Sequence, residues 1–428
     1  MSKTKKIAIL SIVLISILYD ASVHAVTTIN SIRFEGNETT KEIFLRREMY
    51  FTEGDVFDET RLADSIQALV DTGLFTNINY YISSDIPEDE LATDSQIDLV
   101  IQVKEKYYLL LLPRIRVKEN ETNIGLQLRW DNLFGMNHGL RFLEENRGST
   151  GNIDESRTEF DYTYPNVKGS RYSLNFSYAA ENKVDNSNPG LETNRIDQSL
   201  GVSVSRWLNS SGRNFGWFAN VGWSVREREN DLLDNLLADE KLSALVLSLE
   251  YGFAETHDYG YNRSGKEFGY KVDMANRIIH SDTEFARHEL YYRSYYRFKS
   301  RPLDNLNVQT ILGHASHDIM GNQAFNIGGD NLRGYETARF EDNAMLLINM
   351  EYVTPLQKYP QLRFVSFVDL GNTYADVEDV VHGGLKTGVG FGLRWKIRSF
   401  VKLSLRVDLG YGISDQDYRI TAGTSYSY

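Results

Sequence analysis

The stretch Tyr172–Tyr178, YSLNFSY, decides the fold of this chain. Its even-numbered residues are apolar or aromatic, whereas its odd-numbered residues are small and polar. Successive side chains of a β-strand point to opposite faces, so this alternation predicts a strand with one apolar face and one polar face. The same period of two residues recurs from Tyr107 to the end of the chain, and it predicts an all-β architecture there.

The polar faces of the predicted strands carry charge. In Leu245–Tyr251 the leucines alternate with Ser248 and Glu250, and in Leu403–Leu409 the apolar residues alternate with Ser404, Arg406 and Asp408. Charged residues are unexpected between the packed sheets of a sandwich, but they fit a transmembrane β-barrel with a wet lumen and a lipid-facing outer surface. The roughly 320 residues of 106–428, at roughly 20 residues for each strand and its connection, predict about 16 antiparallel strands.

Polar stretches of unequal length separate the strands. We expect long loops at Glu144–Glu155, Glu181–Arg195 and Glu227–Glu240, and short turns such as Lys168-Gly169 at the opposite end of the barrel. Long outer loops and short inner turns are typical of outer-membrane barrels. The chain ends in a predicted strand, Arg419–Tyr428, whose aromatic end resembles the signal that barrel-assembly machinery reads.

Composition limits the function. The chain has 428 residues, a net charge of −13 and no cysteine, and its mean hydropathy is −0.39. The acidic balance and the lack of a basic stripe argue against nucleic-acid binding, and the lack of cysteine excludes disulfides and thiolate metal sites. No apolar run after residue 25 reaches 18 residues, which excludes transmembrane helices but leaves a β-barrel open.

The first 25 residues have the features of a secretory signal peptide. Lys3, Lys5 and Lys6 precede the apolar run Ile7–Leu18, and Val23-His24-Ala25 supplies small residues at signal-peptidase spacing. The run is short for an uncleaved membrane anchor. We therefore expect cleavage after Ala25 and a mature chain outside the cytoplasm.

Residues 26–105 predict a separate small α+β domain in the order β-α-α-β-β. Thr39 and Glu42 have the spacing of a capping box at the start of a short helix, and Asp58 caps a second helix that ends at Gly73. A strand, Thr27–Phe34, precedes the helices. Two strands follow them, Phe75–Ile82 and Ile97–Val103, joined by the acidic loop Asp85–Asp94. We find no catalytic constellation in this domain.

Three stretches of this domain carry a resemblance: EGN at 35–37, EGDVFD at 53–58 and DTGLFTNI at 71–78. Together with the element order, they resemble a POTRA domain, of which we find one copy; the alternative is a generic α+β domain. POTRA domains are periplasmic modules, and the resemblance implies that the domain binds polypeptides by adding a strand to a sheet edge. Edge pairing satisfies backbone groups without reading sequence closely, which suits a module that meets many unfolded chains.

Within the barrel region, Ile327–Glu336, IGGDNLRGYE, predicts a bent loop. Gly328, Gly329 and Gly334 allow backbone angles that other residues resist, and the loop presents Arg333 beside Tyr335. Such a loop can be an ordinary turn. Nearby strands offer it a docking wall, because alternation puts Glu351, Phe367, Asp369 and Gly371 on lumen faces. One arginine can hold a loop against such carboxylates through paired hydrogen bonds.

Five stretches, which follow one another along the chain in the same order as in the family, resemble the BamA/TamA superfamily of outer-membrane insertases and two-partner secretion translocases. Leu332–Glu336 resembles its [VIL]-R-G-[FY] motif, and Asp131–Gly135 resembles its N-x-x-G pattern. Glu351 with Pro355, and Phe367–Gly371, resemble its E-x-x-x-P and F-x-D-x-G strands. Gly388, Gly390, Gly392 and Arg394 resemble the next strand, although Ile397-Arg398 replaces the usual proline. The resemblance covers residues 27–428 and implies that Arg333 pairs with Asp369.

The resemblance implies a function in the bacterial outer membrane, with the POTRA-like domain in the periplasm. The barrel would insert outer-membrane proteins or pass polypeptides across the membrane, pairing with client strands at the POTRA edge and at the seam between its first and last strands. The alternative is a passive pore or a lipid-handling barrel. We expect outer-membrane lipid and unfolded or secreted polypeptides as partners, a monomeric barrel, and accessory proteins.

Enzyme chemistry is not predicted. No histidine lies in a nucleophile elbow or an H-E-x-x-H motif. His314 and His317 fall on opposite faces of a strand, so we expect no shared metal and no cofactor. The Gly388-x-Gly390-x-Gly392 pattern lacks the helix of a dinucleotide site. We interpret these glycines as positions where the loop or large neighbours approach the strand closely.

Overall fold

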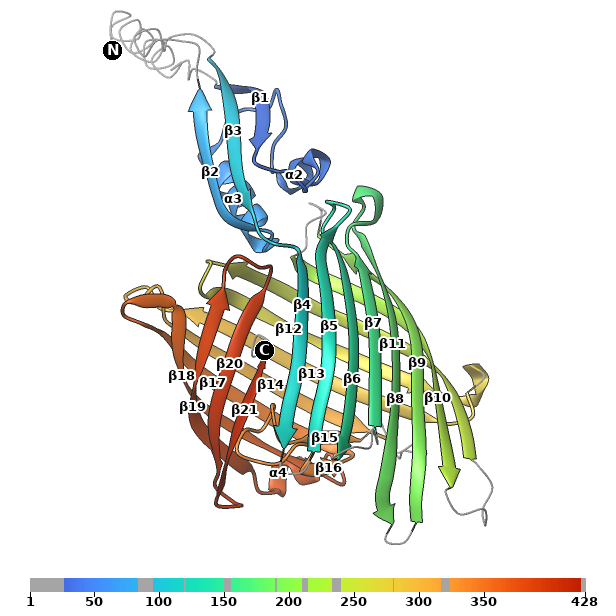
Figure 1. Cartoon of the computed structure of the whole chain (residues 1–428). Helices are drawn as coiled ribbons and strands as arrows, with labels where there is room; N and C mark the ends of the chain where they lie inside the picture. Colours follow the sequence, from blue (N-terminus) through green and yellow to red (C-terminus); the bar gives the residue numbers. More distant parts are fainter. Residues whose placement is uncertain are drawn as a thin grey trace, which may run out of the picture.

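The computed structural model of the protein describes residues 27–83, 95–118, 121–149, 155–188, 191–209, 215–232, 240–279, 281–316 and 324–424. The predicted signal peptide, the acidic loop Asp85–Asp94, His317 and the last four residues lie outside these ranges. Figure 1 shows a small N-terminal domain at one end of a barrel.

The N-terminal domain has the predicted order of elements. It consists of β1 (Thr28–Glu35), α2 (Glu42–Glu48), α3 (Glu59–Asp71), β2 (Phe75–Ser83) and β3 (Gln96–Glu105). The sheet order is β1-β3-β2, with β1 parallel and β2 antiparallel to the central β3.

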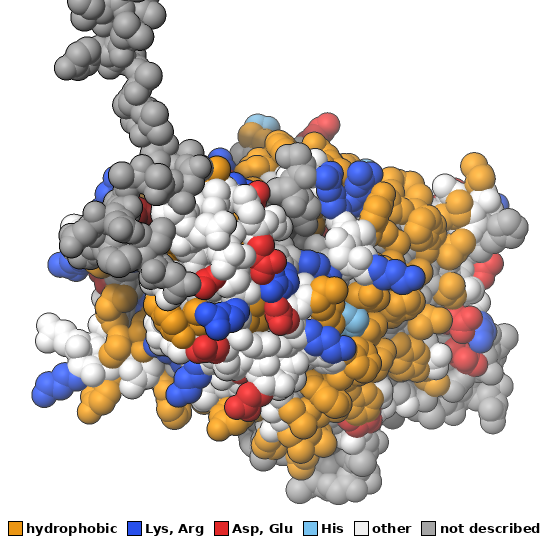
Figure 2. All heavy atoms as spheres, turned by 90° about the horizontal axis from the view of Figure 1, so that it is seen from above, with side chains coloured by type: hydrophobic (Ala, Val, Ile, Leu, Met, Phe, Trp, Pro, Cys, Tyr) orange, Lys and Arg blue, Asp and Glu red, His pale blue; other side chains and the backbone are white. Residues whose placement is uncertain are grey.

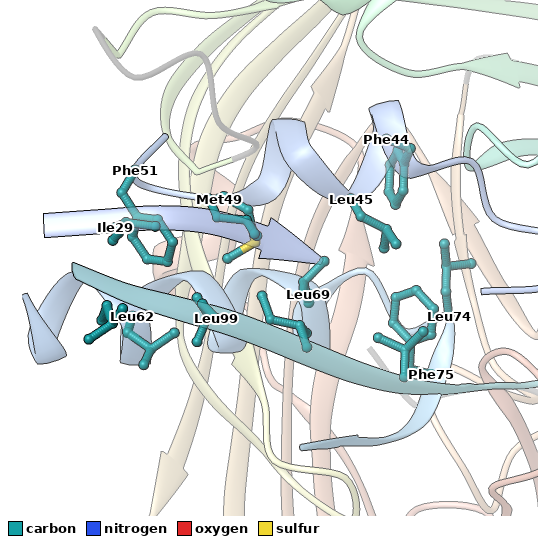
Figure 3. Close-up of a cluster of buried hydrophobic side chains, with 14 of the residues drawn as sticks. Ile29, Phe44, Leu45, Met49, Phe51, Leu62, Leu69, Leu74, Phe75 and Leu99 are labelled. Carbon is teal, nitrogen blue, oxygen red and sulfur yellow. The ribbon is translucent and has the colours of Figure 1, made fainter. Parts of the chain in front are cut away.

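A compact apolar core holds this domain together. The helices contribute Phe44, Leu45, Leu62 and Leu69, which pack against Leu99 and other buried residues of the sheet (Figure 3). Burying each such side chain contributes about 1.5–3 kcal/mol relative to exposing it. The side chain of Asp58 accepts hydrogen bonds from two first-turn amides of α3, as predicted for its cap.

The predicted capping box of α2 is wrong. Lys41 occupies the N-cap position, and no side chain caps the helix. Instead, the backbone amides of Thr39 and Thr40 donate to the carboxylate of Glu105, at 3.0 and 2.7 Å. Glu42 pairs with Arg46. A carboxylate from distant strand β3 thus takes the amides that the local motif was expected to satisfy.

The barrel is a 16-stranded antiparallel sheet, which confirms the predicted fold class and strand number. Its strands in chain order are β4 (Leu109–Lys118), β5 (Glu121–Leu133), β6 (His138–Ser149), β7 (Glu155–Tyr164), β8 (Tyr172–Asn188), β9 (Leu191–Trp207), β10 (Gly216–Leu232), β11 (Glu240–Asp258), β12 (Arg263–Ala275), β13 (Phe285–Arg297), β14 (Asn305–Ala315), β17 (Ala344–Leu356), β18 (Tyr359–Tyr374), β19 (Lys386–Ile397), β20 (Leu403–Gly412) and β21 (Asp417–Thr424). The short helix α4 (Asp379–His382) lies between β18 and β19.

The alternating faces of the strands separate as predicted. Outward-facing residues such as Phe176, Leu200 and Tyr251 are exposed, whereas Asp369 and Asp408 are buried on the inner face. In the view from the N-terminal domain, hydrophobic side chains form the broadest continuous areas on the barrel part, and charged side chains are scattered among them (Figure 2). Among the described residues, no helix is long and apolar enough to cross a membrane.

The predicted long loop Glu181–Arg195 is largely strand, and the other two predicted long loops are strand at the ends that the structure describes. β8 and β9 pair through most of Glu181–Arg195, from Glu181↔Asp197 to Asp185↔Thr193. β6 and β7 pair from Glu144↔Thr158 to Arg147↔Glu155, and β10 and β11 pair from Glu227↔Ser243 to Asn230↔Glu240. The middle parts of these two stretches, 150–154 and 233–239, lie outside the described residues. In the sequence of these strand ends, polar residues occupy both odd and even positions, so the alternation disappears while the strand pairing continues.

Two segments position the site inside the barrel. Residues 106–108 join β3 directly to β4, which starts at the end of the barrel next to the N-terminal domain (Figure 1). The connection between β14 and β17 starts at the opposite end. It contains β15 (Phe325–Ile327) and β16 (Phe340–Asp342), which form a two-stranded sheet.

Candidate functional site

The loop between β15 and β16 folds back on itself and places Arg333 inside the barrel. The amide of Gly329 donates to the carbonyl of Tyr335 at 3.0 Å, which closes the loop. Gly334, next to Arg333, has φ of +93°, a backbone conformation that favours glycine. Arg333 is 1% exposed, so the loop is docked and does not form a surface turn.

Arg333 binds Asp369 of β18 through three hydrogen bonds. Its Nε donates to Oδ2 and its Nη2 donates to Oδ1, both at 2.7 Å, and its backbone amide donates to Oδ2 at 3.1 Å. The guanidinium also lies over the ring of Phe367, with Cζ 3.5 Å from the ring centroid. The planar guanidinium thus has a carboxylate at its edge and an aromatic ring at its face, an arrangement that lysine cannot reproduce.

Two further carboxylates and a second arginine complete a buried ion cluster, defined here as Arg333, Arg394, Glu351, Asp369 and Asp408. Glu351 accepts from both arginines, from Arg333 Nη1 at 2.5 Å and from Arg394 Nη2 at 3.0 Å. Asp408 accepts from Arg394 at 2.5 and 3.0 Å and lies 3.6 Å from Arg333. Two guanidinium groups therefore face three carboxylates, and all five side chains are buried.

The amide of Asn349 joins the loop backbone to this cluster. Its Nδ2 donates to Asp369 Oδ1 at 2.8 Å and to the carbonyl of Asn331 at 2.7 Å. Asn349, Asp408 and Arg394 had no site role predicted from the sequence. Alternation could place these residues on lumen faces, but the pairs they form depend on the stagger between strands, which the pattern of one strand does not contain.

Glycines in β19 and β20 make room for the loop, as the sequence interpretation of Gly388-x-Gly390-x-Gly392 expected. A Cβ at Gly388 would lie 2.0 Å from the carbonyl oxygen of Arg333, and one at Gly412 would lie 2.6 Å from that of Gly334. At Gly371 the nearest loop atom would be Ile327 Cδ1, at 3.3 Å. The loop backbone therefore lies directly on the inner surface of the barrel wall.

Tyr335 ties the loop to the last hairpin of the barrel. Its hydroxyl donates to the carbonyl of Thr387 at 2.9 Å and accepts from the amide of Ser414 at 3.2 Å. Ser414 lies in the turn between β20 and β21. The loop therefore contacts both β18, through Arg333, and the hairpin that ends the sheet.

The two ends of the sheet meet beside the docked loop. β4 and β21 are the terminal strands, and no described residue of one pairs with the other. They lie side by side (Figure 1) and both line a cavity of about 1040 Å³, whose wall also includes loop residues such as Gly328 and Asp330. At the end near the N-terminal domain, the amide of Tyr107 donates to the carbonyl of Ser399 at 2.7 Å.

The arrangement can hold a loop against the barrel wall and release it. Within the described ranges, no group of three or more histidine or carboxylate side chains is arranged to hold a metal ion, and the three carboxylates of the cluster are paired with its two arginines. The cluster fixes a loop to the barrel wall by charge-assisted hydrogen bonds, and the loop borders an unpaired seam. Such a device can stabilise one state of the seam.

Sequence comparisons place both parts of the chain. The family model described as "Omp85 superfamily domain" matches residues 132–426, and the POTRA model, "Surface antigen variable number repeat", matches residues 27–106. A curated relative, "Outer membrane protein assembly factor BamA" of Nitratidesulfovibrio vulgaris, is 23% identical over 396 residues. That alignment covers 86% of this chain and 47% of the relative, so the chain spans about half of the relative's length.

Solved structures share the fold. BamA from Haemophilus ducreyi lacking POTRA domains 1–3 matches with a TM-score of 0.55 and 15% identity, covering 93% of this chain and 84% of that one. CdiB from Escherichia coli matches with a TM-score of 0.62 and 14% identity, covering 93% and 75%. CdiB from Acinetobacter baumannii gives 0.57 and 17%, with 93% and 73% covered. Since the superfamily model covers well over half of the chain, this protein, a 16-stranded barrel behind a POTRA domain, belongs to the Omp85 superfamily.

Proposed function

We propose that this protein is an outer-membrane barrel that handles polypeptides, either inserting proteins into the outer membrane or passing them across it, with its POTRA domain in the periplasm. One observation carries the proposal: among the described residues, a strand edge in the POTRA domain and a strand edge at the barrel seam have no partner strand. Unpaired backbone amides and carbonyls are a template for a further strand. The likeness to an assembly factor supports the same class of client.

The free edge of the POTRA sheet is β2. The other outer strand, β1, is already covered: the amide of Ile29 donates to Asp55, its carbonyl accepts from Gly54, and Arg46 donates to the carbonyl of Ile32. Among the described residues, β2 pairs only with β3. Its second half carries Tyr80, Tyr81 and Ile82, which are all exposed. An extended client adding to β2 would pair with its backbone and pack against these side chains.

The seam offers the second edge. β4 contains Pro113, and proline, which lacks an amide hydrogen, is found within sheets on edge strands. The cavity beside the seam is lined by β4 residues such as Leu112 and by β21 residues such as Ile420. A client strand that pairs with β4 there would lie between the lumen and the lipid.

The buried ion cluster would set the state of this seam. Arg333 holds the loop on β18, and Tyr335 holds the turn of the β20–β21 hairpin. While the loop is docked, the last hairpin is braced against the wall. We propose that this docked state keeps the seam in order between clients.

Reconstitution tests the proposal. Proteoliposomes containing the protein should speed the folding of an unfolded outer-membrane barrel, measured by its heat-modifiable migration, relative to empty liposomes. A matched protein with the POTRA domain removed controls for the membrane-perturbing effect of the barrel alone. If the liposomes only leak small solutes and client folding is not accelerated, the passive-pore function would replace this one.

A further inference from the structure

The N-x-x-G stretch, Asn132–Gly135, lies where β5 ends and the turn to β6 begins. It belongs neither to the seam nor to the docked loop. Its backbone is unusual: Asn132, Phe134 and Asn137 all have positive φ, at 53°, 63° and 59°. Asparagine tolerates this region, but a bulky residue such as phenylalanine rarely adopts it. Backbone held in sparsely populated conformations points to a functional constraint.

This turn contacts the POTRA domain on one side of β4. The side-chain amide of Asn132 donates through Nδ2 to the hydroxyl of Thr40 at 2.8 Å, and that hydroxyl forms a hydrogen bond with the hydroxyl of Tyr108 at 3.1 Å. The backbone amide of Lys41 donates to the carbonyl of Gly135 at 2.9 Å. Asn132 and Thr40 are each 1% exposed, so water does not compete for these bonds.

Gly135 sets how closely the two parts approach. It has φ of +69°, and a Cβ there would lie 2.2 Å from the carbonyl oxygen of Thr39. Met136 packs against the core of the POTRA domain. The turn therefore fits the segment Thr39–Lys41 through shape, apolar contact and two hydrogen bonds.

On the other side of β4, strand β2 begins over the turn between β19 and β20. Arg398 in that turn donates through Nη2 to the carbonyl of Thr76 at 2.6 Å. Lys106, in the segment that joins β3 to β4, donates to the carbonyl of Gly73 at 2.7 Å. The β19–β20 turn thus lies next to β2, and β20 pairs with β21, the strand that flanks the unpaired edge of β4. The free edge of β2 and the unpaired edge of β4 therefore lie on the same side of the continuous path from β3 to β4 (Figure 1).

We propose that the turn Asn132–Asn137 is a socket that holds the POTRA domain in one orientation, so that a client strand paired with β2 is handed over to the free edge of β4. The partner is an extended polypeptide with unpaired backbone amides and carbonyls. The hand-over rests on the proposed function, whereas the socket itself does not, because it concerns two parts of one chain.

The socket can be tested without any client. Asp71 and His257 lie in direct contact at a third point of the interface, with Oδ2 and Nδ1 2.7 Å apart. In this cysteine-free chain, cysteines at both positions report docking through their rate of crosslinking by a short bismaleimide. Gly135→Ala should lower that rate at least tenfold. Gly216→Ala is the matched control, because Gly216 also has positive φ, at +91°, but a Cβ there meets nothing closer than 3.9 Å.

A second variant guards against misfolding of the turn. Thr40→Val keeps the shape of the side chain but removes the hydroxyl that accepts from Asn132, so it should also slow crosslinking while heat-modifiable migration stays normal. Equal rates for Gly135→Ala, Thr40→Val and the control would overturn the socket.

Photo-crosslinking with an unfolded barrel client tests the hand-over. A crosslinker at Tyr81 in β2 and one at Leu111 in β4 should both capture client in the parent protein. In Gly135→Ala, capture at Tyr81 should persist and capture at Leu111 should fall. Undiminished capture at Leu111 would overturn the hand-over. Capture at neither position in the parent protein would overturn the hand-over and the proposed function together, and the crosslinking rate would still decide the socket.

Discussion

Arg333 places three hydrogen bonds on the single carboxylate of Asp369, although 36 residues separate them in the chain, and both residues are buried. The sequence interpretation assumed a wet lumen around this pair. The structure buries it in a cluster of two guanidinium groups and three carboxylates, which carries one net negative charge. This composition decides how substitutions should behave.

Arg333→Ala should release the loop. It leaves three buried carboxylates with one guanidinium, and breaking a buried pair costs roughly 3–5 kcal/mol. The 16-strand ladder does not depend on this pair, so the barrel should still form. Labelling of a cysteine at Leu332, which is fully buried, should become much faster. Arg333→Lys keeps the charge but loses the planar guanidinium that binds both oxygens of Asp369, so it should slow the labelling at position 332 only in part relative to Arg333→Ala. Unchanged labelling in Arg333→Ala would show that the loop is held by its apolar contacts alone.

Asp369→Ala should release the loop less than Arg333→Ala, because it leaves two guanidinium groups facing two carboxylates. The double variant returns the cluster to its original net charge, so its labelling rate should fall below that of Arg333→Ala. The three rates can be compared with the same cysteine at Leu332. The reverse order, with Asp369→Ala the faster of the two single variants, would mean that hydrogen-bond geometry outweighs net charge here.

Gly388→Ala should undock the loop without changing any charge. The added Cβ would lie 2.0 Å from the carbonyl oxygen of Arg333, which neither backbone can accommodate without moving. Gly139→Ala in β6 is the control, because nothing lies within 4 Å of its Cβ position. Only the first substitution should speed labelling at Leu332 and lower the temperature at which heat-modifiable migration is lost. If Gly388→Ala behaves like Gly139→Ala, the loop does not lie on β19 in the membrane.

Much of this architecture was predictable because it depends on the two-residue alternation of apolar and polar side chains along β-strands. Alternation such as that of Tyr172–Tyr178 predicted the barrel, and the spacing of Asp58 and Gly73 predicted α3. The prediction failed where a distant partner decided the outcome. Glu105, which is 65 residues from Thr40, replaced the expected capping box of α2.

The candidate site likewise contains residues that local sequence predicts and residues that only their distant partners determine. The loop glycines and lumen-facing carboxylates follow from local chemistry, so Arg333, Glu351 and Asp369 could be predicted. Arg394 and Asp408 complete the cluster through the stagger of β19 against β20, in which Gly392 lies opposite Asp408 and Arg394 opposite Arg406. That register is set by turns and by the whole sheet, so no single strand encodes it.

Raising the pH should strengthen the contact between the POTRA domain and the barrel through Lys106. Burial, with Lys396, Arg398 and Lys402 nearby, lowers the pKa of Lys106 from 10.5 to about 8, and Asp258 offsets this only in part. Between these values the unfolded state binds more protons than the folded state, so the free energy of unfolding rises with pH across this window. The rise from Lys106 is at most about 3–4 kcal/mol, at about 1.36 kcal/mol for each pKa unit.

Pulse proteolysis of the POTRA domain in the full-length protein measures this effect. The urea midpoint should rise between pH 7.5 and 10 in the parent protein, and Lys106→Met should flatten that rise. A Lys104→Met variant, altering an exposed lysine of β3, should keep the full rise. An equal rise in the parent and in Lys106→Met would assign the pH dependence to other groups.

The central claim is that clients pair with the barrel at its open seam. Cysteines at Leu112 in β4 and Thr421 in β21, which line the same cavity, allow the seam to be closed with a cleavable thiol crosslinker. Cysteines at Leu128 and Phe142, which face each other on the paired strands β5 and β6, provide the matched control. In proteoliposomes, closing the seam should abolish the acceleration of client folding, cleaving the link should restore it, and the β5–β6 link should leave it unchanged. A seam-closed protein that folds clients at the unlinked rate would contradict the account.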